Sequence, residues 1–295
     1  MQDFTGKIAV VTGGGSGIGR ALVRRLAQDG CHVATCDIRA ETLAETRTLA
    51  LGAAPPGVTV TTFVADVADE AQVTAFCKDT LTRHDSDHVH LVFGNAGVGG
   101  GGSFVTDSRQ VWERTFNVCW GGVYNTARAF MPALIRAPKG RLVNVSSVNG
   151  FWASLGPTTT HTAYSAAKFA VKGFTEALIV DLRLNAPHVE VSLVMPGHIG
   201  TSIYENSIAE FAPDMDAPDL AEAMARAEAF RNAGLTPEQA ADVILDGVRE
   251  GRWRILVGPD AFALDAIVRA EPERAYDLDF FDRVAAESGR RAERA

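Results

Sequence analysis

The chain has 295 residues, of which 46% are hydrophobic and 22% are charged, as expected for a globular protein with a substantial core. Its formal net charge is −8, so its composition does not favour binding to nucleic acid or to an anionic membrane. The four cysteines form no CxxC pair and no metal-ligand spacing, so we expect reduced thiols, no metal site and a cytoplasmic location. No apolar run is long enough to span a membrane, and the start, MQDFTGKIAVV, lacks a signal-peptide pattern.

Short β-branched runs alternate with helical patterns along most of the chain. Strands are predicted at Lys7–Val11, His32–Cys36, Val58–Val64, Val89–Phe93, Arg141–Val145, Val189–Val194 and Arg254–Val257. Helices are predicted at Ile18–Gly30, Glu41–Leu51, Glu70–Arg83, Ser108–Ile135, Thr162–Leu184 and Gln239–Glu250. This alternation predicts an α/β fold: one doubly wound domain over residues 1–295, with a central parallel sheet of about seven strands and helices on both faces.

Two segments look like additions to this pattern. Residues 202–235 are rich in Ala, Glu and Met, and we expect them to form a lid over the substrate. Residues 260–295 are charged and amphipathic, with Phe280 and Phe281 among their apolar positions, and we expect a C-terminal helical extension there.

A glycine-rich loop, TGGGSGIG at Thr12–Gly19, lies between the first predicted strand and the first predicted helix. In open α/β sheets a dinucleotide binds at this point. We expect Gly13 and Gly17 to let the backbone turn and approach a pyrophosphate, and Gly19 to let the helix pack closely on the strand. The N-terminus of the helix then offers free N–H groups to the phosphates. The loop therefore predicts that the domain is of the Rossmann type.

Asp37 follows the second predicted strand, about 20 residues beyond the glycine loop. A carboxylate at this place accepts hydrogen bonds from the adenosine ribose and repels a 2′-phosphate. Neither Ser16 nor Ile38 offers a cation to such a phosphate, although Arg39 lies close by. We therefore expect NAD as the cofactor, with NADP as the alternative.

Tyr164 and Lys168 stand four residues apart in AYSAAKFAVKGF, on a predicted helix, and therefore on one helix face. An ammonium beside a phenol favours the phenolate, so Lys168 is expected to lower the pKa of Tyr164. A lone pair of this kind is most often an ordinary tyrosine and a solvated lysine. The glycine loop and Asp37 in the same chain favour the functional interpretation.

In their order along the chain, these features resemble the classical branch of the short-chain dehydrogenase/reductase family. The resemblance runs from Phe4 to Thr201 and again over Arg252–Pro259. Its motifs beyond the glycine loop are Asp66-Val67, Asn95-Ala96-Gly97, Asn117 in FNVCWGGV, Ser147 in VNVSS, Tyr164 and Lys168 in YSAAK, and Pro196-Gly197 with Thr201 in PGHIGT. So many motifs in one order argue against a chance match.

The resemblance implies a catalytic group of Asn117, Ser147, Tyr164 and Lys168. Tyr164 would exchange a proton with the substrate oxygen, which Ser147 would hold in place, and Asn117 would hold a water that connects Lys168 to solvent. It also implies a cofactor site formed by Gly13, Ser16, Gly17, Ile18, Gly19, Asp37, Asp66, Val67, Asn95, Ala96, Gly97, Tyr164, Lys168, Pro196, Gly197, Ile199 and Thr201.

One departure from the family pattern concerns the spacing of Ser147 and Tyr164, which is a few residues longer than usual. The extra length falls in FWASLGPTTTHTA and would reshape the wall beside the substrate. If it displaced Ser147, Ser146 or Thr162 would be the alternative hydroxyl.

The implied activity is an NAD-dependent interconversion of a secondary alcohol and a ketone by hydride transfer. Phe151, Trp152, His198 and Tyr204 are expected to line the substrate cleft, and their apolar character suggests a lipophilic or cyclic substrate. The alternatives are an NADPH-dependent carbonyl or 3-oxoacyl reductase of the same fold and a dinucleotide-sensing protein without catalysis. Small residues along Ala166–Ala177 suggest close helix packing, and the resemblance implies a homodimer or homotetramer.

Overall fold

The computed structural model describes residues 2–100, 102–155, 159–211 and 217–292. Its centre is a parallel sheet of seven strands in the order β3-β2-β1-β4-β5-β6-β7. The strands are β1 (Ile8–Thr12), β2 (His32–Asp37), β3 (Val60–Val64), β4 (Leu91–Gly94), β5 (Gly140–Val145), β6 (Val189–Pro196) and β7 (Arg254–Val257). The predicted doubly wound α/β fold is confirmed.

The middle of the sheet is buried on both faces, which explains its continuous apolar runs. Val10 of β1 lies opposite Ala34 of β2 and Val92 of β4, and all three side chains are fully buried. The strand order reverses between β1 and β4, which places the topological switch point at the carboxyl ends of these two strands.

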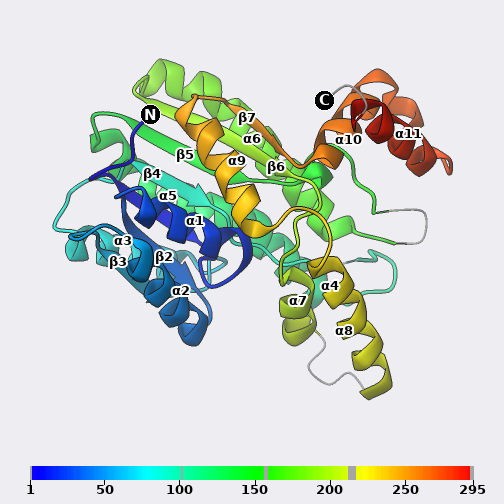
Figure 1. Cartoon of the computed structure of the whole chain (residues 1–295), viewed down its shortest axis with the longest axis horizontal. Helices are drawn as coiled ribbons and strands as arrows, with labels where there is room; N and C mark the ends of the chain where they lie inside the picture. Colours follow the sequence, from blue (N-terminus) through cyan, green and yellow to red (C-terminus); the bar gives the residue numbers. More distant parts are fainter. Residues whose placement is uncertain (1, 101, 156–158, 212–216, 293–295) are drawn as a thin grey trace.

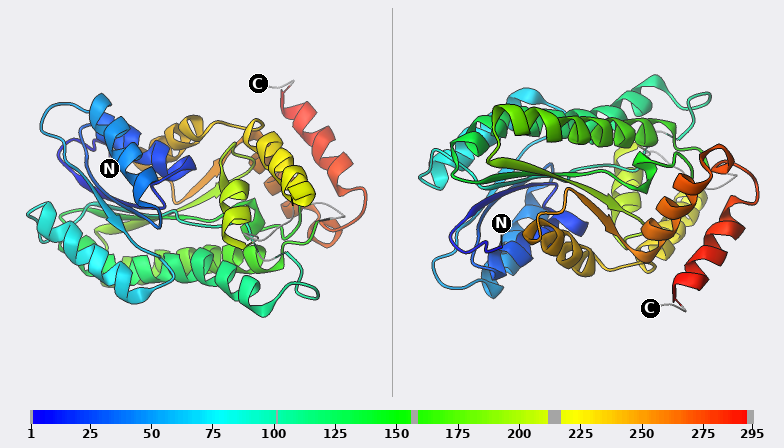
Figure 2. Two further views of the ribbon diagram at one scale, coloured as in Figure 1. Left: turned by 90° about the horizontal axis from the view of Figure 1, so that it is seen from below. Right: turned by 90° about the horizontal axis from the view of Figure 1, so that it is seen from above.

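Helices cover both faces of the sheet (Figures 1 and 2). One layer consists of α1 (Gly17–Gln28), α2 (Ala40–Ala53) and α9 (Pro237–Arg249). The other consists of α3 (Glu70–Arg83), α4 (Arg109–Phe116), α5 (Gly122–Arg136) and α6 (Thr162–Asn185). Within the described residues, none of the helices has the length and hydropathy needed to cross a membrane.

The long helix predicted at Ser108–Ile135 is interrupted in the structure. Between α4 and α5 the chain forms a π-helical turn, η1 (Asn117–Gly121), which takes up more residues per turn than an α-helix. Side chains within and after this turn are therefore rotated relative to a continuous α-helix. This rotation changes which residue of the segment faces the sheet.

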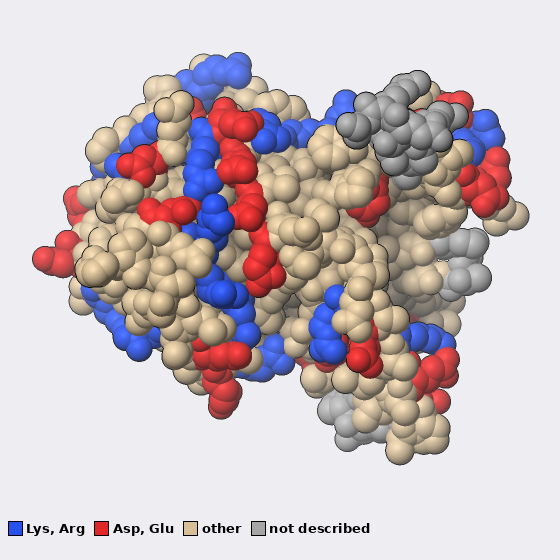
Figure 3. Space-filling model, viewed as in Figure 1, with Lys and Arg blue, Asp and Glu red and all other residues tan. Residues whose placement is uncertain are grey.

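Charged side chains of both signs stand beside one another on the face formed by α1 and α9 (Figure 3). Ion pairs connect these helices: Arg24 with Glu238 at 3.4 Å, and Arg25 with Asp242 at 3.0 Å. Exposed pairs of this kind contribute little to stability. Because positive and negative groups alternate here, this face carries no large electrostatic potential of one sign.

The two added segments lie at the same end of the sheet, beyond the carboxyl ends of β6 and β7 (Figure 1). The first contains α7 (Ile203–Phe211) and α8 (Ala217–Arg231), and positions 212–216 of the predicted lid lie outside the described residues. The second contains α10 (Pro259–Ala270), a short 3-10 turn, η3 (Pro272–Arg274), and α11 (Phe280–Ala292).

The C-terminal segment packs against Trp152 and Ala153, which follow β5 in the sequence. The Phe280 ring is 2% exposed and packs on the Trp152 ring with 4.9 Å between centroids. The Trp152 indole donates a hydrogen bond to the Ala275 carbonyl at 2.8 Å, and the Ala153 N–H donates to the Tyr276 hydroxyl at 3.1 Å. This docking places Phe281 and Val284 of α11 in the lining of a cleft at this end of the sheet.

Candidate active site

A cleft of about 730 Å³ opens at the carboxyl end of the sheet. It contains the switch point between β1 and β4, where α/β proteins of this topology bind dinucleotides. The predicted residues that line it are Gly13, Ser16, Gly17, Ile18, Gly19, Asp37, Asp66, Val67, Asn95, Ala96, Gly97, Ser147, Trp152, Tyr164, Lys168, Pro196, Gly197, His198, Ile199, Thr201 and Tyr204. Asn117 and Phe151 are not among its lining residues.

The glycine loop fits the backbone of a phosphate site. Gly13 has a φ of +69°, and a Cβ there would lie 2.8 Å from the Ala96 Cα. A Cβ on Gly19 would lie 2.0 Å from the Gly13 carbonyl oxygen. A side chain at Gly13 would therefore clash with the turn after β4, and one at Gly19 would clash with the loop itself, so glycine lets the N-terminus of α1 pack closely here.

Asp37 points its carboxylate into the adenosine end of the cleft. One carboxylate oxygen accepts from the Gly15 N–H at 3.0 Å and the other from the Arg39 N–H at 3.3 Å. Two N–H donors fix the group and leave further lone pairs for ribose hydroxyls. The loop and Asp37 together fit a nicotinamide dinucleotide.

The ends of β1 and β4 are joined beneath this site. The Thr12 hydroxyl accepts from the N–H groups of Asn95 at 3.0 Å and Ala96 at 3.2 Å. The Asn95 side-chain amide donates to the Thr12 carbonyl at 2.9 Å. The predicted Asn95-Ala96-Gly97 turn is thus fixed against the strand that carries the glycine loop.

Tyr164, Lys168 and Ser147 come together at the other end of the cleft. Tyr164 and Lys168 lie in the first two turns of α6, and the Lys168 ammonium is 5.3 Å from the centroid of the Tyr164 ring. The same ammonium donates to the Val145 carbonyl at 3.0 Å. Ser147, just beyond β5, lines the same cleft, and its hydroxyl accepts from the Asn149 N–H at 3.1 Å.

Ser146 and Thr162, the two alternatives to Ser147, use their hydroxyl groups in other hydrogen bonds. The Ser146 hydroxyl donates to the Lys168 carbonyl at 2.8 Å. The Thr162 hydroxyl donates to the Gly102 carbonyl and accepts from the Trp112 indole. The long spacer therefore leaves Ser147 in the cleft, although its positions 156–158 lie outside the described residues.

In the protein alone, the electrostatics of the pair differ from the sequence-based prediction. Burial raises the pKa of Tyr164, the neighbouring Cys119 raises it further, and the nearby Ser147 hydroxyl acts in the opposite direction. Burial also lowers the pKa of Lys168. The predicted lowering of the Tyr164 pKa by Lys168 was therefore wrong for the protein alone, because desolvation dominates.

The Asn117 side chain does not line the cleft. Asn117 opens the π turn, and its side chain is exposed, whereas Cys119 two residues later is fully buried. A Cβ on Gly97 would lie 3.6 Å from the Lys168 ammonium and 3.7 Å from the Cys119 sulfur, so these two groups flank the same glycine. Cys119, which lies within the π turn, is therefore a close neighbour of Lys168.

Helix α7 crosses the cofactor end of the cleft. Asn206 accepts from the Arg39 guanidinium at 2.6 Å and donates to the Ser16 hydroxyl at 3.3 Å. Arg114 links Asp66 with Glu210 of α7, with 2.6 Å to each carboxylate. None of these α7 contacts was predicted, because they join residues far apart in the sequence.

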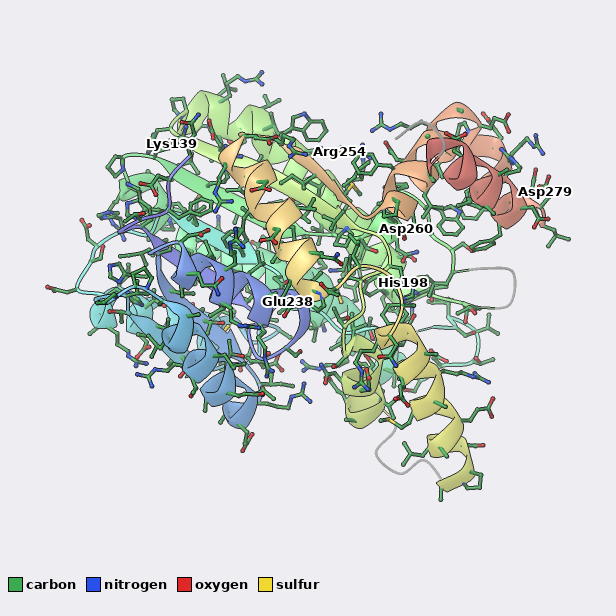
Figure 4. The ribbon with its side chains drawn as sticks, in the orientation of Figure 1. Lys139, His198, Glu238, Arg254, Asp260 and Asp279 are labelled. Atoms are coloured by element: carbon green, nitrogen blue, oxygen red, sulfur yellow. The ribbon has the colours of Figure 1, made fainter. Side chains whose placement is uncertain are left out.

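The substrate end has a largely apolar wall. Trp152 and Tyr204 are among the residues that line the cleft, and His198 lies close to Asp260 where the sheet meets the added segments (Figure 4). The His198 N–H donates to the Asp260 carboxylate at 2.7 Å, and its ring stacks on Phe230. Lining residues that the sequence analysis missed include Leu155, His161, Phe230, Leu264, Phe281 and Val284.

Phe151 is the second predicted residue outside the cleft. Its ring packs against the core cluster and faces the Arg254 guanidinium at 5.8 Å.

The four buried cysteines are unpaired, and the described part of the chain holds no cluster of His, Cys, Asp or Glu suited to a metal ion.

The fold and the site define an α/β protein built to bind a dinucleotide. The short chain dehydrogenase family model matches residues 7–210, and the chain belongs to this family. SadH of Mycobacterium tuberculosis, a protein assigned as an oxidoreductase, is 38% identical over 269 residues, which cover 91% of this chain and 92% of SadH.

Two solved structures illustrate the range of cofactors among similar proteins. A short-chain dehydrogenase/reductase from Burkholderia phymatum in complex with NAD has a TM-score of 0.79 at 33% identity, covering 93% of this chain and 95% of that one. A metagenomic short-chain oxidoreductase in complex with NADP has a TM-score of 0.65 at 25% identity, covering 86% of this chain and 97% of that one.

The position of Asn117 leads to a first prediction. Asn117→Ala should leave kcat/KM and the free energy of unfolding nearly unchanged, because exposed substitutions away from a site stay within about 0.5 kcal/mol. Steady-state kinetics and urea denaturation measure both. A tenfold fall in kcat/KM with unchanged stability would restore Asn117 to the catalytic group.

Proposed function

We propose that this protein is an NAD-dependent oxidoreductase that interconverts a secondary alcohol and a ketone, with Tyr164 as the acid/base. The observation that carries the proposal is the meeting of Tyr164, Ser147 and Lys168 in one cleft with the glycine loop and Asp37. Membership of the short-chain dehydrogenase family supports the oxidoreductase class.

The roles of the side chains follow from their positions. A nicotinamide bound in the cleft would supply the carbon that exchanges the hydride with the substrate. In alcohol oxidation the Tyr164 oxygen accepts the hydroxyl proton, and in ketone reduction it returns that proton. Ser147 holds the substrate oxygen beside Tyr164 by a hydrogen bond. The raised pKa of Tyr164 would fall when a positive charge is brought beside the phenol, so Tyr164 becomes a base only in the complete site.

The apolar wall supports a lipophilic or cyclic substrate. Trp152, Leu264 and Phe281 contribute apolar surface to the substrate end. In this proposal residues 202–235 form a lid over the substrate. The support is that Asn206 of α7 hydrogen-bonds Ser16 of the glycine loop, across the cleft.

NAD is the proposed cofactor because the Asp37 carboxylate would repel a 2′-phosphate. We expect NAD⁺ to bind at least about tenfold more tightly than NADP⁺, and Asp37→Ala to remove most of this difference. Calorimetry of both nucleotides measures it, with Glu41→Gln, an exposed residue of α2, as the matched control.

Tighter binding of NADP⁺ to the unchanged protein would favour the NADPH-dependent carbonyl or 3-oxoacyl reductase instead. In that case Arg39 would be the 2′-phosphate ligand. Its guanidinium lies at this end of the cleft, and its Nε has no partner in the described part of the chain.

Tyr164→Phe separates catalysis from binding. We expect a loss of about 100- to 10,000-fold in kcat, the range of a positioned acid/base, with the NAD dissociation constant nearly unchanged. Dehydrogenase assays on a panel of alcohols and ketones, together with nucleotide titrations, provide both values. If the unchanged protein binds NAD but turns over none of the panel, the sensing role gains support.

Self-association is proposed through the outer face of α5 and α6. Tyr124, Phe169 and Val180 expose apolar side chains there, and a Cβ on Gly173 would meet no atom within 4 Å. Such a surface suits burial against a second copy. Light scattering at micromolar concentration should give the mass of a dimer or tetramer, whereas a monomeric mass would contradict the proposal.

A further inference from the structure

His161 has a buried imidazole directly before α6, beside Tyr164. The residue is 8% exposed, and its ring stacks on the Tyr164 ring with 4.5 Å between centroids and 24° between planes. It also lines the cleft, on the substrate side. Neither ring nitrogen, Nδ1 or Nε2, has a hydrogen-bond partner among the described residues.

Two unpartnered nitrogens in one buried ring are unfavourable. A buried polar atom without a partner destabilises the folded protein, and native proteins satisfy most such atoms. Desolvation lowers the pKa of His161 to about 4, so the ring is neutral near pH 7. A neutral imidazole offers one N–H donor and one acceptor nitrogen.

The surroundings limit what this ring edge can bind. Ser147 and Tyr164 are committed to the reacting oxygen in the proposed function, and Trp152, Leu264 and Phe281 give the same cleft apolar lining. His161 therefore provides hydrogen bonding in a largely apolar part of the cleft. Because its ring lies directly on the Tyr164 ring, a group bound there must sit close to the reacting carbon.

We infer that His161 is a specificity-determining residue that hydrogen-bonds a second oxygen of the substrate, on a carbon next to the reacting carbon or one further away. The preferred substrates are then 1,2- or 1,3-oxygenated compounds: diols, hydroxy ketones or diketones. This inference rests on the proposed function and narrows its substrate class. The competing view is that His161 is only an aromatic spacer for Tyr164.

The test compares cyclohexanol with trans-cyclohexane-1,2-diol in NAD⁺-dependent oxidation by the full-length protein. The two probes share a ring and differ by one hydroxyl. We expect kcat/KM to favour the diol by about 10- to 100-fold, since one buried hydrogen bond is being satisfied. His161→Phe keeps a stacking ring without nitrogens and should bring the preference close to one, whereas His161→Gln should restore part of it.

A preference that His161→Phe leaves unchanged would overturn the inference. An equal fall in kcat/KM for both substrates would also leave the preference unchanged, and it is the result expected if His161 were only an aromatic spacer. A wild-type enzyme without preference for the diol would overturn it too.

A measurement that needs no turnover distinguishes this inference from the proposed function. Ring ¹⁵N signals of histidine-labelled protein are recorded with NAD⁺ bound, and His161 is assigned by its absence in His161→Phe. Addition of the diol, but not of cyclohexanol, should shift the His161 nitrogens. A shift without turnover would support the diol site and reject the dehydrogenase proposal, and no shift would reject the diol site.

Discussion

The desolvation of Tyr164 and Lys168 on one face of α6 is the constraint on which the site depends. Burial acts against the charged form of both groups, because it raises the pKa of the phenol and lowers that of the ammonium. In the protein alone the pair therefore favours a neutral phenol. A positive charge placed beside the pair would favour the phenolate, so in the proposed function an oxidised nicotinamide makes the site more basic.

The sheet explains how such a pair is brought to a dinucleotide. All seven strands are parallel, so their carboxyl ends share one edge, and the glycine loop, Asp37, Asn95 and Ser147 all lie at or just beyond these ends. The two added segments then enclose the substrate end. α7 is joined to the glycine loop through Asn206, and α11 rests on Trp152 through Phe280.

Local patterns predicted much of this arrangement. The seven strands, the glycine loop and the four-residue spacing of Tyr164 and Lys168 depend on neighbouring residues, so the sequence was sufficient for them. The π turn that begins at Asn117 was not foreseen, because an α-helical pattern conceals it; the Asn117 side chain is exposed there and Cys119 is buried. The role of Asn117 stays a prediction. His161 was missed because its burial and its stacking exist only in the folded chain. Phe280 and Phe281 are adjacent in the sequence, and only the docking of α11 shows that Phe280 is the buried anchor and Phe281 lines the cleft.

The central claim is that a bound positive charge turns Tyr164 from a neutral phenol into a base. The direct measurement is an ultraviolet titration of tyrosinate, in which the curve of Tyr164→Phe is subtracted from that of the wild type. It is made on the free protein, with NAD⁺ and with NADH. The account predicts that Tyr164 ionises at a clearly lower pH with NAD⁺ than in the free protein, and that NADH, whose nicotinamide ring is uncharged, has a smaller effect. An ionisation pH that NAD⁺ leaves unchanged or raises would contradict it.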